Sequence, residues 1–363
     1  MTKRILTGDR PTGRLHLGHY VGSLINRVRL QSEFDTVLII ADLHMLTTKA
    51  SKEDIANILP NARGIVADYI GAGIDPQKTT IYLQSGVPEV AGIAQLLQSL
   101  VTVNRLSRLP SLKDMARDAN IDENSISFAL LGYPVLQSAD ILGPKANVVP
   151  VGKDNEAHVE ITREIARRFN GTYEEVFPIP EVMLSDTPSL VGLDGGAKMS
   201  KSLGNCIFLN EDPRSLEKKV NSIFTDPNRL RADIPGRVEG NVLFVYHDTF
   251  NPNRDEVKEF KHRYREGRIG DKEIKARLLE VLTDLLRPIQ ERMREAEQDS
   301  AFIDRILLNG IDRVRSLAAE TLRDMRTAMG LQSTLTRLRR SVERADKKTK
   351  AADGSQPADE ASP

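Results

Sequence analysis

The sequence predicts an α/β fold in which a doubly wound parallel sheet is followed by a domain made of helices alone. Three observations lead to this prediction. Short apolar runs without polar alternation, typical of strands buried on both faces, recur through the first 210 residues. Amphipathic stretches separate these runs. From about residue 211, apolar residues repeat only at helical spacing.

The elements of the first half follow one another as strand and helix. Strands are expected at residues 5–6, 36–41, 80–84 and 147–151, because the apolar residues of these runs do not alternate with polar ones. Helices are expected at 16–31, at 52–71, at 90–103 and through 161–169. In such sheets, ligands bind at the carboxyl ends of the strands, near a switch in strand order.

The second half divides into a helical region and a tail. Residues 211–330 are expected to form helices, one of them kinked at Pro288. Beyond Val342 the only apolar side chains are alanines, so residues 331–363 are expected to be largely disordered.

Composition excludes several classes of protein. The 51 basic residues balance 51 acidic ones, so overall charge gives no sign of nucleic-acid binding. A single cysteine, Cys206, excludes a disulfide framework and a multi-thiolate zinc site. The start of the chain lacks a signal-peptide pattern, and no run of about 18 apolar residues appears. We therefore expect a cytoplasmic protein.

A histidine motif, HLGH at residues 16–19, follows the first predicted strand and a glycine-containing turn. The helix start behind such a turn presents unpaired backbone N–H groups that bind phosphate. His16 and His19 share one face of its first turn, where they can donate to phosphate oxygens that gain charge. Gly18 lets a flat adenine approach the backbone. A helix-capping pair or half of a metal site are the alternatives, although no third ligand lies nearby in sequence.

A lysine motif, KMSKS at residues 198–202, lies among glycines about 180 residues further on. Two lysines on a glycine-hinged loop suit a mobile clamp that closes on a triphosphate and stabilises departing pyrophosphate. By itself, a string of lysine and serine is more often a solvated loop. Together with the histidine motif, it indicates adenylyl transfer to a carboxylate.

These two motifs match the signatures of class I aminoacyl-tRNA synthetases, and residues 4 to about 330 resemble bacterial tryptophanyl-tRNA synthetases. The resemblance also rests on ADLH at 41–44, LQS at 83–85, YPVLQSADIL at 133–142 and VPVG at 149–152, followed by Asp154, His158, Glu160 and Arg163. It implies a homodimer that uses ATP with Mg²⁺ as co-substrate, with tRNA(Trp) as partner and no tightly bound cofactor or metal. The implied domains are a Rossmann-like catalytic domain at 1–210 and a helical anticodon-binding domain at 211–330. Within the former, a helical insertion at about 105–140 would form the dimer interface, and 190–206 a mobile lysine loop.

The resemblance also assigns site residues. His16, His19, Lys198 and Lys201 are the implied catalytic residues. The implied ATP contacts are Arg10, Pro11, Thr12, Gly18, His19, Gly152, Lys153, Asp154, Leu190, Lys198, Met199, Ser200, Lys201 and Ser202. The implied contacts of the substrate tryptophan are Asp140, Tyr133, Gln137 and His44.

The tryptophan residues have physical arguments of their own. Asp140 stands in an apolar run, so its carboxylate needs a partner. The resemblance makes it the acceptor for the indole N–H, a partner present only when substrate is bound, so ligands without that N–H should be strongly rejected. A salt-bridged or capping aspartate is the alternative. Tyr133 and Gln137, four apart, are expected to hold the ammonium. His44 either flanks the pocket or is a packed structural histidine.

The chain departs from its relatives at several positions. Many relatives have an acid and a glutamine where this chain has Lys153 and Asn155, and Met115 replaces a lysine expected shortly after Lys113. Lys113 alone, or Arg117, is then left to contact the phosphates. None of these departures touches the histidines, the lysines or Asp140.

We conclude that the sequence predicts a tryptophan–tRNA ligase, and three rivals remain. A tyrosyl-specific enzyme would usually need a tyrosine on the first strand, which has Ile5 and Leu6 instead. A small nucleotidyltransferase would lack the helical extension, and a silent RNA-binding paralogue would not need intact motifs. For tRNA, the candidate contacts of the helical domain, which are equally ordinary solvated residues, are Lys218, Lys219, Arg229, Arg231, Arg263 and Arg265.

Overall fold

The computed structural model describes residues 2–353 apart from 119–120, 123–124, 153–155, 185–189, 197, 227–228 and 230. Its centre is a five-stranded parallel sheet with the order β3-β2-β1-β4-β5, which confirms the predicted fold class. The order changes direction between β1 and β4, and this is the switch point of the sheet. The strands are β1 (Arg4–Asp9), β2 (Asp35–Ile40), β3 (Thr79–Leu83), β4 (Val148–Val151) and β5 (Glu181–Leu184).

Both faces of the sheet are buried, as the apolar strands predict. Along β2, Leu38 and Ile40 join one apolar cluster, whereas Val37 and Ile39 join another on the opposite face. The last strand, β5, was missed, because its apolar run is only three residues long and none of its four residues is fully buried. It lies at the edge of the sheet and pairs only with β4 among the described strands.

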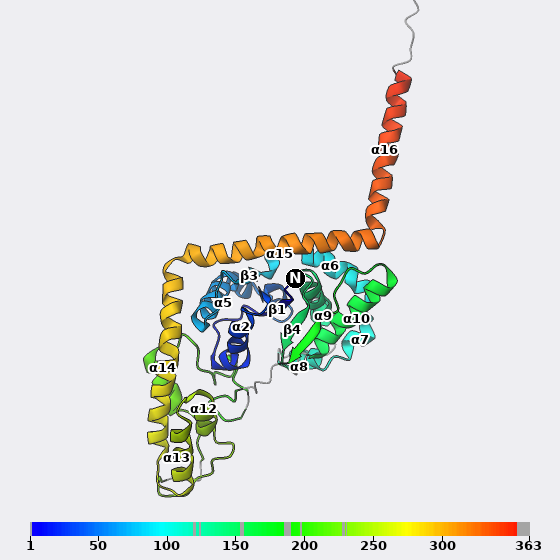
Figure 1. Cartoon of the computed structure of the whole chain (residues 1–363). Coiled ribbons are helices and arrows are strands. Elements are labelled where there is room, and N and C mark those ends of the chain that lie inside the picture. Colours follow the sequence, from blue (N-terminus) through cyan, green and yellow to red (C-terminus); the bar gives the residue numbers. More distant parts are fainter. Residues whose placement is uncertain are drawn as a thin grey trace, which may run out of the picture.

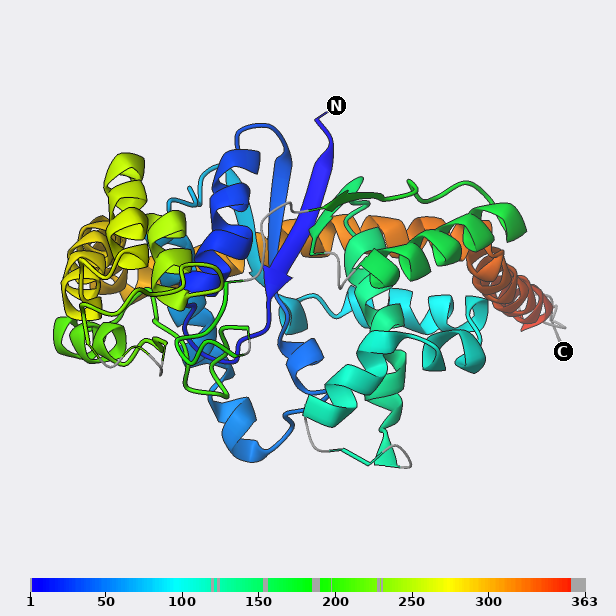
Figure 2. The same cartoon turned by 90° about the horizontal axis from the view of Figure 1, so that it is seen from below.

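Helices cover the two faces (Figures 1 and 2). The predicted helix at 16–31 is one continuous helical segment with a π-helical middle. In the first 210 residues the helical segments are α1 (Leu17–His19), η1 (Tyr20–Leu24), α2 (Ile25–Leu30), α3 (Asp42–Met45), α4 (Lys52–Ala56), α5 (Ile58–Ala72), η2 (Gln84–Gly86), α6 (Glu89–Leu97), η3 (Gln98–Leu100), α7 (Val103–Ser107), α8 (Pro110–Asp118), α9 (Phe128–Leu142) and α10 (Glu156–Thr172).

The region after residue 210 is helical where it is regular, as predicted, and α14 continues through Pro288. Its last helices, however, also belong to the sheet domain. In Figure 1, α15 crosses beside β3 and α6, and a Cβ on its Gly310 would lie only 1.9 Å from the Ile81 carbonyl oxygen of β3. The helices are α11 (Pro213–Asn221), α12 (Val242–Phe250), α13 (Arg254–Arg265), α14 (Asp271–Gln298), α15 (Ser300–Ala328) and α16 (Leu331–Asp353).

Helix α16 corrects the expectation of a largely disordered tail for residues 331–353. The expectation rested on the lack of apolar residues beyond Val342, but α16 consists mostly of leucine, alanine, arginine and lysine, and these residues favour the helical state without a core. Figure 1 shows α16 pointing away from the rest of the chain. Residues 354–363 lie outside the described part.

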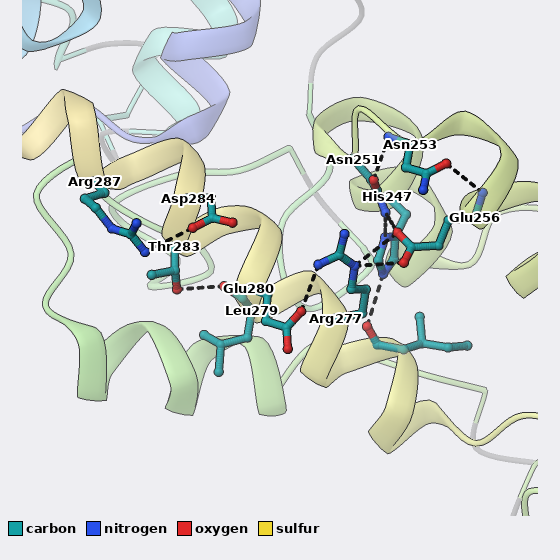
Figure 3. Close-up of polar contacts among 11 residues, drawn as sticks. His247, Asn251, Asn253, Glu256, Arg277, Leu279, Glu280, Thr283, Asp284 and Arg287 are labelled. Carbon is teal, nitrogen blue, oxygen red and sulfur yellow. Dashed lines mark hydrogen bonds and ion pairs between the residues drawn. The ribbon is translucent and has the colours of Figure 1, made fainter.

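A buried polar cluster joins α12, α13 and α14 (Figure 3). The side chain of Asn251 donates to Nδ1 of His247 at 3.2 Å and to Glu256 at 2.8 Å. The other ring nitrogen of His247 therefore holds the proton that it donates to the Ile274 carbonyl oxygen at 3.1 Å. Arg277 of α14 completes the cluster by donating to Glu256 at 2.9 Å.

A second polar anchor of this region is Arg229, whose side chain is only 2% exposed. It pairs with Asp271 at 3.0 Å and lies over the ring of Tyr264 at 4.0 Å. It also donates to the carbonyl oxygens of Ala232, Ile234 and Ile269. Arg229 is thus a structural residue, and its proposed contact with tRNA is wrong in this arrangement.

We expect Arg229→Met to lower the free energy of unfolding by about 3–5 kcal/mol, because it leaves a carboxylate and three carbonyl oxygens without their donor. Arg231→Met is the matched control, since Arg231 is 76% exposed and pairs only with the exposed Asp233; its effect should stay below about 1 kcal/mol. Urea unfolding of both variants measures the difference. Equal midpoints would show that the buried arginine contributes no more than the exposed one.

Candidate active site at the carboxyl edge of the sheet

The residues chosen from the sequence lie where strands end at one edge of the sheet. The loop of residues 10–16 follows β1, and α3 with Asp42 and His44 follows β2. Gln84 follows β3, and Gly152 follows β4. Because the strands are parallel, these segments meet at the same edge, beside the switch point.

His16 and His19 cap the first helical turn in a reciprocal way. Nδ1 of His16 accepts from the Gly18 N–H at 3.1 Å, and Nδ1 of His19 accepts from the His16 N–H at 3.3 Å. In each neutral ring the proton must then be on Nε2. The capping interpretation and the catalytic one are therefore compatible, because capping leaves both rings with an N–H donor at Nε2.

The lysine loop is held against this turn. Phe208, just after the loop, forms an isolated antiparallel β-bridge with His16. The Sδ atom of Met199 lies 3.3 Å from the Gly18 nitrogen. Within the loop, the Met199 N–H donates to the Leu190 carbonyl oxygen at 3.0 Å. The ammonium of Lys201 donates to the carbonyl oxygen of Gly13 at 2.8 Å. The two motifs, about 180 residues apart in sequence, thus form one site.

A buried ion pair fixes the end of β1 beneath the histidines. Asp9 pairs with Arg27 at 2.5 Å and accepts from the Tyr69 hydroxyl at 2.7 Å. Burial by itself would raise the pKa of Asp9, but the charges of Arg27 and His19 and the hydrogen bonds from Arg27 and Tyr69 together hold it below the ordinary value. Neither Asp9 nor Arg27 was singled out from the sequence, where a charge next to a glycine turn gives no sign of its partner.

Electrostatics keeps both histidines neutral. Burial, the neighbouring His19 and the two lysines lower the pKa of His16 to about 3. Burial lowers the pKa of His19 to about 4, although Asp9 opposes this. Burial also lowers the pKa of Lys201. The site therefore combines neutral N–H donors with cationic lysines, an arrangement suited to phosphate oxygens.

The lowered pKa of His16 makes stability depend on pH. Below about pH 6.5 the unfolded chain protonates this histidine while the folded protein does not, so the free energy of unfolding falls as the pH decreases. We expect the parent to lose up to about 1.4 kcal/mol more per pH unit than His16→Gln between pH 6 and 4.5. Urea unfolding at several pH values, with exposed His262→Gln as control, tests this. Parallel curves for the parent and His16→Gln would contradict it.

The predicted tryptophan residues partly converge. Asp140 on α9 is only 2% exposed; its carboxylate accepts from Nε2 of His44 at 2.8 Å and from the Gln84 amide at 2.9 Å. Burial raises the pKa of Asp140, and these two hydrogen bonds oppose the rise. The expectation that its partner comes only with substrate is wrong, because the protein itself supplies two. Gln84 was present in the LQS stretch but received no role.

Gln84 also orients the segment after β2. Its carbonyl oxygen accepts from the backbone N–H groups of Leu43 at 3.1 Å and His44 at 3.4 Å. One buried amide therefore joins the ends of β2 and β3 to Asp140 on α9. His44 is accordingly a packed residue that bonds to Asp140, and its place beside a substrate pocket stays a prediction.

Tyr133 belongs to a second network that was not predicted. Its hydroxyl lies 2.8 Å from that of Ser111 and 2.7 Å from Nε2 of His158. Burial raises the pKa of Tyr133, and the hydrogen bond with Ser111 and the charge of Arg10 partly oppose this rise. Gln137, one turn further along α9, is half-buried. His158 appeared in the resemblance, but a hydrogen bond to a tyrosine 25 residues away leaves no sequence signal.

The remaining predicted ATP residues are more dispersed. The Pro11 carbonyl oxygen accepts from Asn61 at 2.9 Å, while Thr12 and Gly152 are half-buried. Lys198 and Ser202 are exposed on the lysine loop. Lys153 and Asp154 lie outside the described residues. Among the described residues, no group of three or more side chains that could hold a metal ion occurs.

The comparisons with known proteins decide the family. The model of class I tRNA synthetases for tryptophan and tyrosine matches residues 2–287. A tryptophan–tRNA ligase of Treponema pallidum is 56% identical over 330 residues, which cover 91% of this chain and 97% of that one. The chain belongs to the tryptophanyl-tRNA synthetase family. Another relative, the tryptophan–tRNA ligase of Chlamydia caviae, is 51% identical and covers 91% of this chain and 96% of its own.

A solved tryptophanyl-tRNA synthetase has the same fold. The enzyme from Campylobacter jejuni, complexed with ADP and tryptophan, superposes with a TM-score of 0.79 at 32% identity, covering 90% of this chain and 99% of that chain. The resemblance seen in the sequence is confirmed, and with it the Rossmann-like synthetase fold. The chain is therefore an aminoacyl-tRNA synthetase.

Proposed function

We propose that this protein activates L-tryptophan with ATP, releasing pyrophosphate, and transfers the amino acid to tRNA(Trp). The observation that supports the chemistry is the meeting of the two motifs, with Lys201 on the Gly13 carbonyl oxygen and Met199 against Gly18. Relatives named tryptophan–tRNA ligase, with identities above 50%, support the substrate. The predicted function agrees with them.

The proposed mechanism needs no general base, because the substrate carboxylate is already a nucleophile that attacks the α-phosphorus. The protein contributes position and charge. The Nε2–H groups of His16 and His19 donate to phosphate oxygens, and Lys198 and Lys201 stabilise the departing pyrophosphate. Lys201 must leave the Gly13 carbonyl oxygen to do so. This contact is therefore the position from which residues 190–206 are proposed to move.

Asp140 is proposed to accept the indole N–H of tryptophan. The carboxylate already has two donors, but ionised oxygens accept further hydrogen bonds. Tyr133 and Gln137 remain proposed contacts of the substrate ammonium, and the fourteen ATP-site residues remain proposals on the same footing. The Campylobacter enzyme holds ADP and tryptophan, which supports ATP use here.

Further parts of the proposal concern partners. Mg²⁺ would arrive with ATP, held mainly by its phosphates, as is usual for this ion. Phe128 of the helical insertion is 71% exposed and Val103, just before the insertion, is 61% exposed, which supports a homodimer through this surface. We also propose that the helices of 211–330 read the anticodon and that the enzyme acts in the cytoplasm. Among the described helices, none has the length and apolar character needed to cross a bilayer.

Pyrophosphate exchange with each of the twenty amino acids tests the function. Exchange should depend on tryptophan alone. The chain contains no tryptophan, so fluorescence of the free amino acid can follow its binding without background. Exchange that depends on tyrosine would overturn the specificity, and absence of exchange with every amino acid would favour a silent paralogue.

A further inference from the structure

The basic residues expected to contact tRNA in the helical domain are mostly engaged elsewhere. Arg229 is buried, and four of the other five candidate residues form ion pairs inside the protein. These pairs are Lys219–Glu211, Arg231–Asp233, Arg263–Glu273 and Arg265–Glu239. Cations already paired with carboxylates offer less to a phosphate backbone, because that pairing must first be broken.

Unpaired cations gather instead on α16. Arg337, Arg340, Arg344 and Lys347 are all exposed, and within the described residues none of them forms an ion pair. At 100° per residue their spacing places them within about 80° of one another, on one stripe about 15 Å long. We call this the basic stripe.

The opposite face of α16 is apolar. Leu331, Leu335, Leu338 and Val342 repeat at intervals of four, three and four residues and are 39–60% exposed. At its base, Leu331 and Leu335 form a groove with Leu96 of α6 and Leu322 of α15. A second copy of the chain could pack on this apolar face, and the basic stripe would still face solvent.

The position of α16 sets what the basic stripe can do. The helix spans about 35 Å, and in Figure 1 it extends away from the rest of the chain. It adds nothing to the core beyond its first turns, so its charges can only act on solvent or on a large partner. The chain has no net charge, which makes a local excess of unpaired cations more conspicuous.

We propose that the basic stripe of α16 binds the phosphate backbone of the tRNA substrate. The inference rests on the proposed function, which makes a polyanion the macromolecular substrate. Arginine and lysine rows on one helix face neutralise phosphates without reading bases, and binding releases counterions. The stripe then strengthens tRNA binding and leaves amino-acid activation untouched.

The test compares one triple variant and one double variant of the full chain. Arg337→Gln/Arg340→Gln/Arg344→Gln removes the basic stripe and keeps helix propensity. It should raise the KM for tRNA roughly tenfold and reduce the salt dependence of tRNA binding by about one unit of slope per lost contact, while tryptophan-dependent pyrophosphate exchange stays at the parent rate. Leu335→Gln/Leu338→Gln alters the opposite face and should leave the KM for tRNA unchanged. Circular dichroism checks that both variants keep their helix content.

Two outcomes would overturn the inference. A parent KM and salt slope in the triple variant would make the stripe an ordinary solvated face. A raised KM in the leucine variant, together with a lower mass by light scattering, would make a second copy the partner of α16. Absence of pyrophosphate exchange in the parent would instead contradict the proposed function, on which the inference rests.

Discussion

Lys201→Ala should lower the rate of tryptophan activation by roughly 10²–10³, the usual loss when one donor to a developing charge is removed. The site offers few substitutes, because His16 and His19 are neutral and Lys198 is exposed. The loss should appear in kcat and leave the KM for tryptophan nearly unchanged, since the interaction forms mainly in the transition state.

Pyrophosphate exchange without tRNA measures this effect. Lys218→Ala is the matched control: it removes an exposed lysine of α11, outside the lysine loop, and should exchange at the parent rate. Lys201→Arg tests position as well as charge, because it keeps the positive charge but replaces the compact ammonium with a longer, planar guanidinium. A parent rate in Lys201→Ala would remove the loop from the mechanism.

Asp140→Ala should reduce kcat/KM for tryptophan by at least about a hundredfold. The change deletes a hydrogen bond to a charged acceptor, which contributes about 1.5–3 kcal/mol, and it leaves His44 and Gln84 without their common partner. The rejection of ligands without an indole N–H should be weaker than the sequence implied. In the parent, Asp140 keeps two donors when such a ligand binds, so it is never left unpaired.

Ser138→Ala controls for the loss of a buried polar group on the same helix. Ser138 is fully buried but bonds to the Pro134 carbonyl oxygen and to Thr162, away from the His44–Asp140 pair. Its kcat/KM should stay within about threefold of the parent. If both variants lost activity equally, general destabilisation would explain the loss, and Asp140 would have no particular role in binding tryptophan.

Much of the site was predictable because its residues are tied to local patterns. Strand ends in a parallel sheet meet at one edge, so any residue just after an apolar run was a candidate. His16, His19, Lys201 and Asp140 were found in this way or through the resemblance. Gln84 and His158 occurred in the resemblance without a role, and Ser111 was not singled out, since their partners lie 22 to 56 residues away and a single polar residue gives no sign of a distant partner.

The limits of local reasoning are clearest in the last two helices. Helical spacing placed α15 correctly as a helix, but it could not tell that Gly310 lies against β3 and closes the sheet domain. Composition suggested disorder for α16, because the expectation considered only burial. Helix propensity, an equally local property, favours the helix there.

The sequence by itself determined the fold class, the family and the reaction, because periodicity and short motifs depend on neighbours along the chain. Only the tertiary structure decided which charges are free to act. It buried Arg229 with Asp271, gave Asp140 two donors and kept His16 neutral, whereas the basic stripe of α16 remained unpaired. The physical reason is that a charge is set by its surroundings in space, through burial and through partners that lie far away in the sequence.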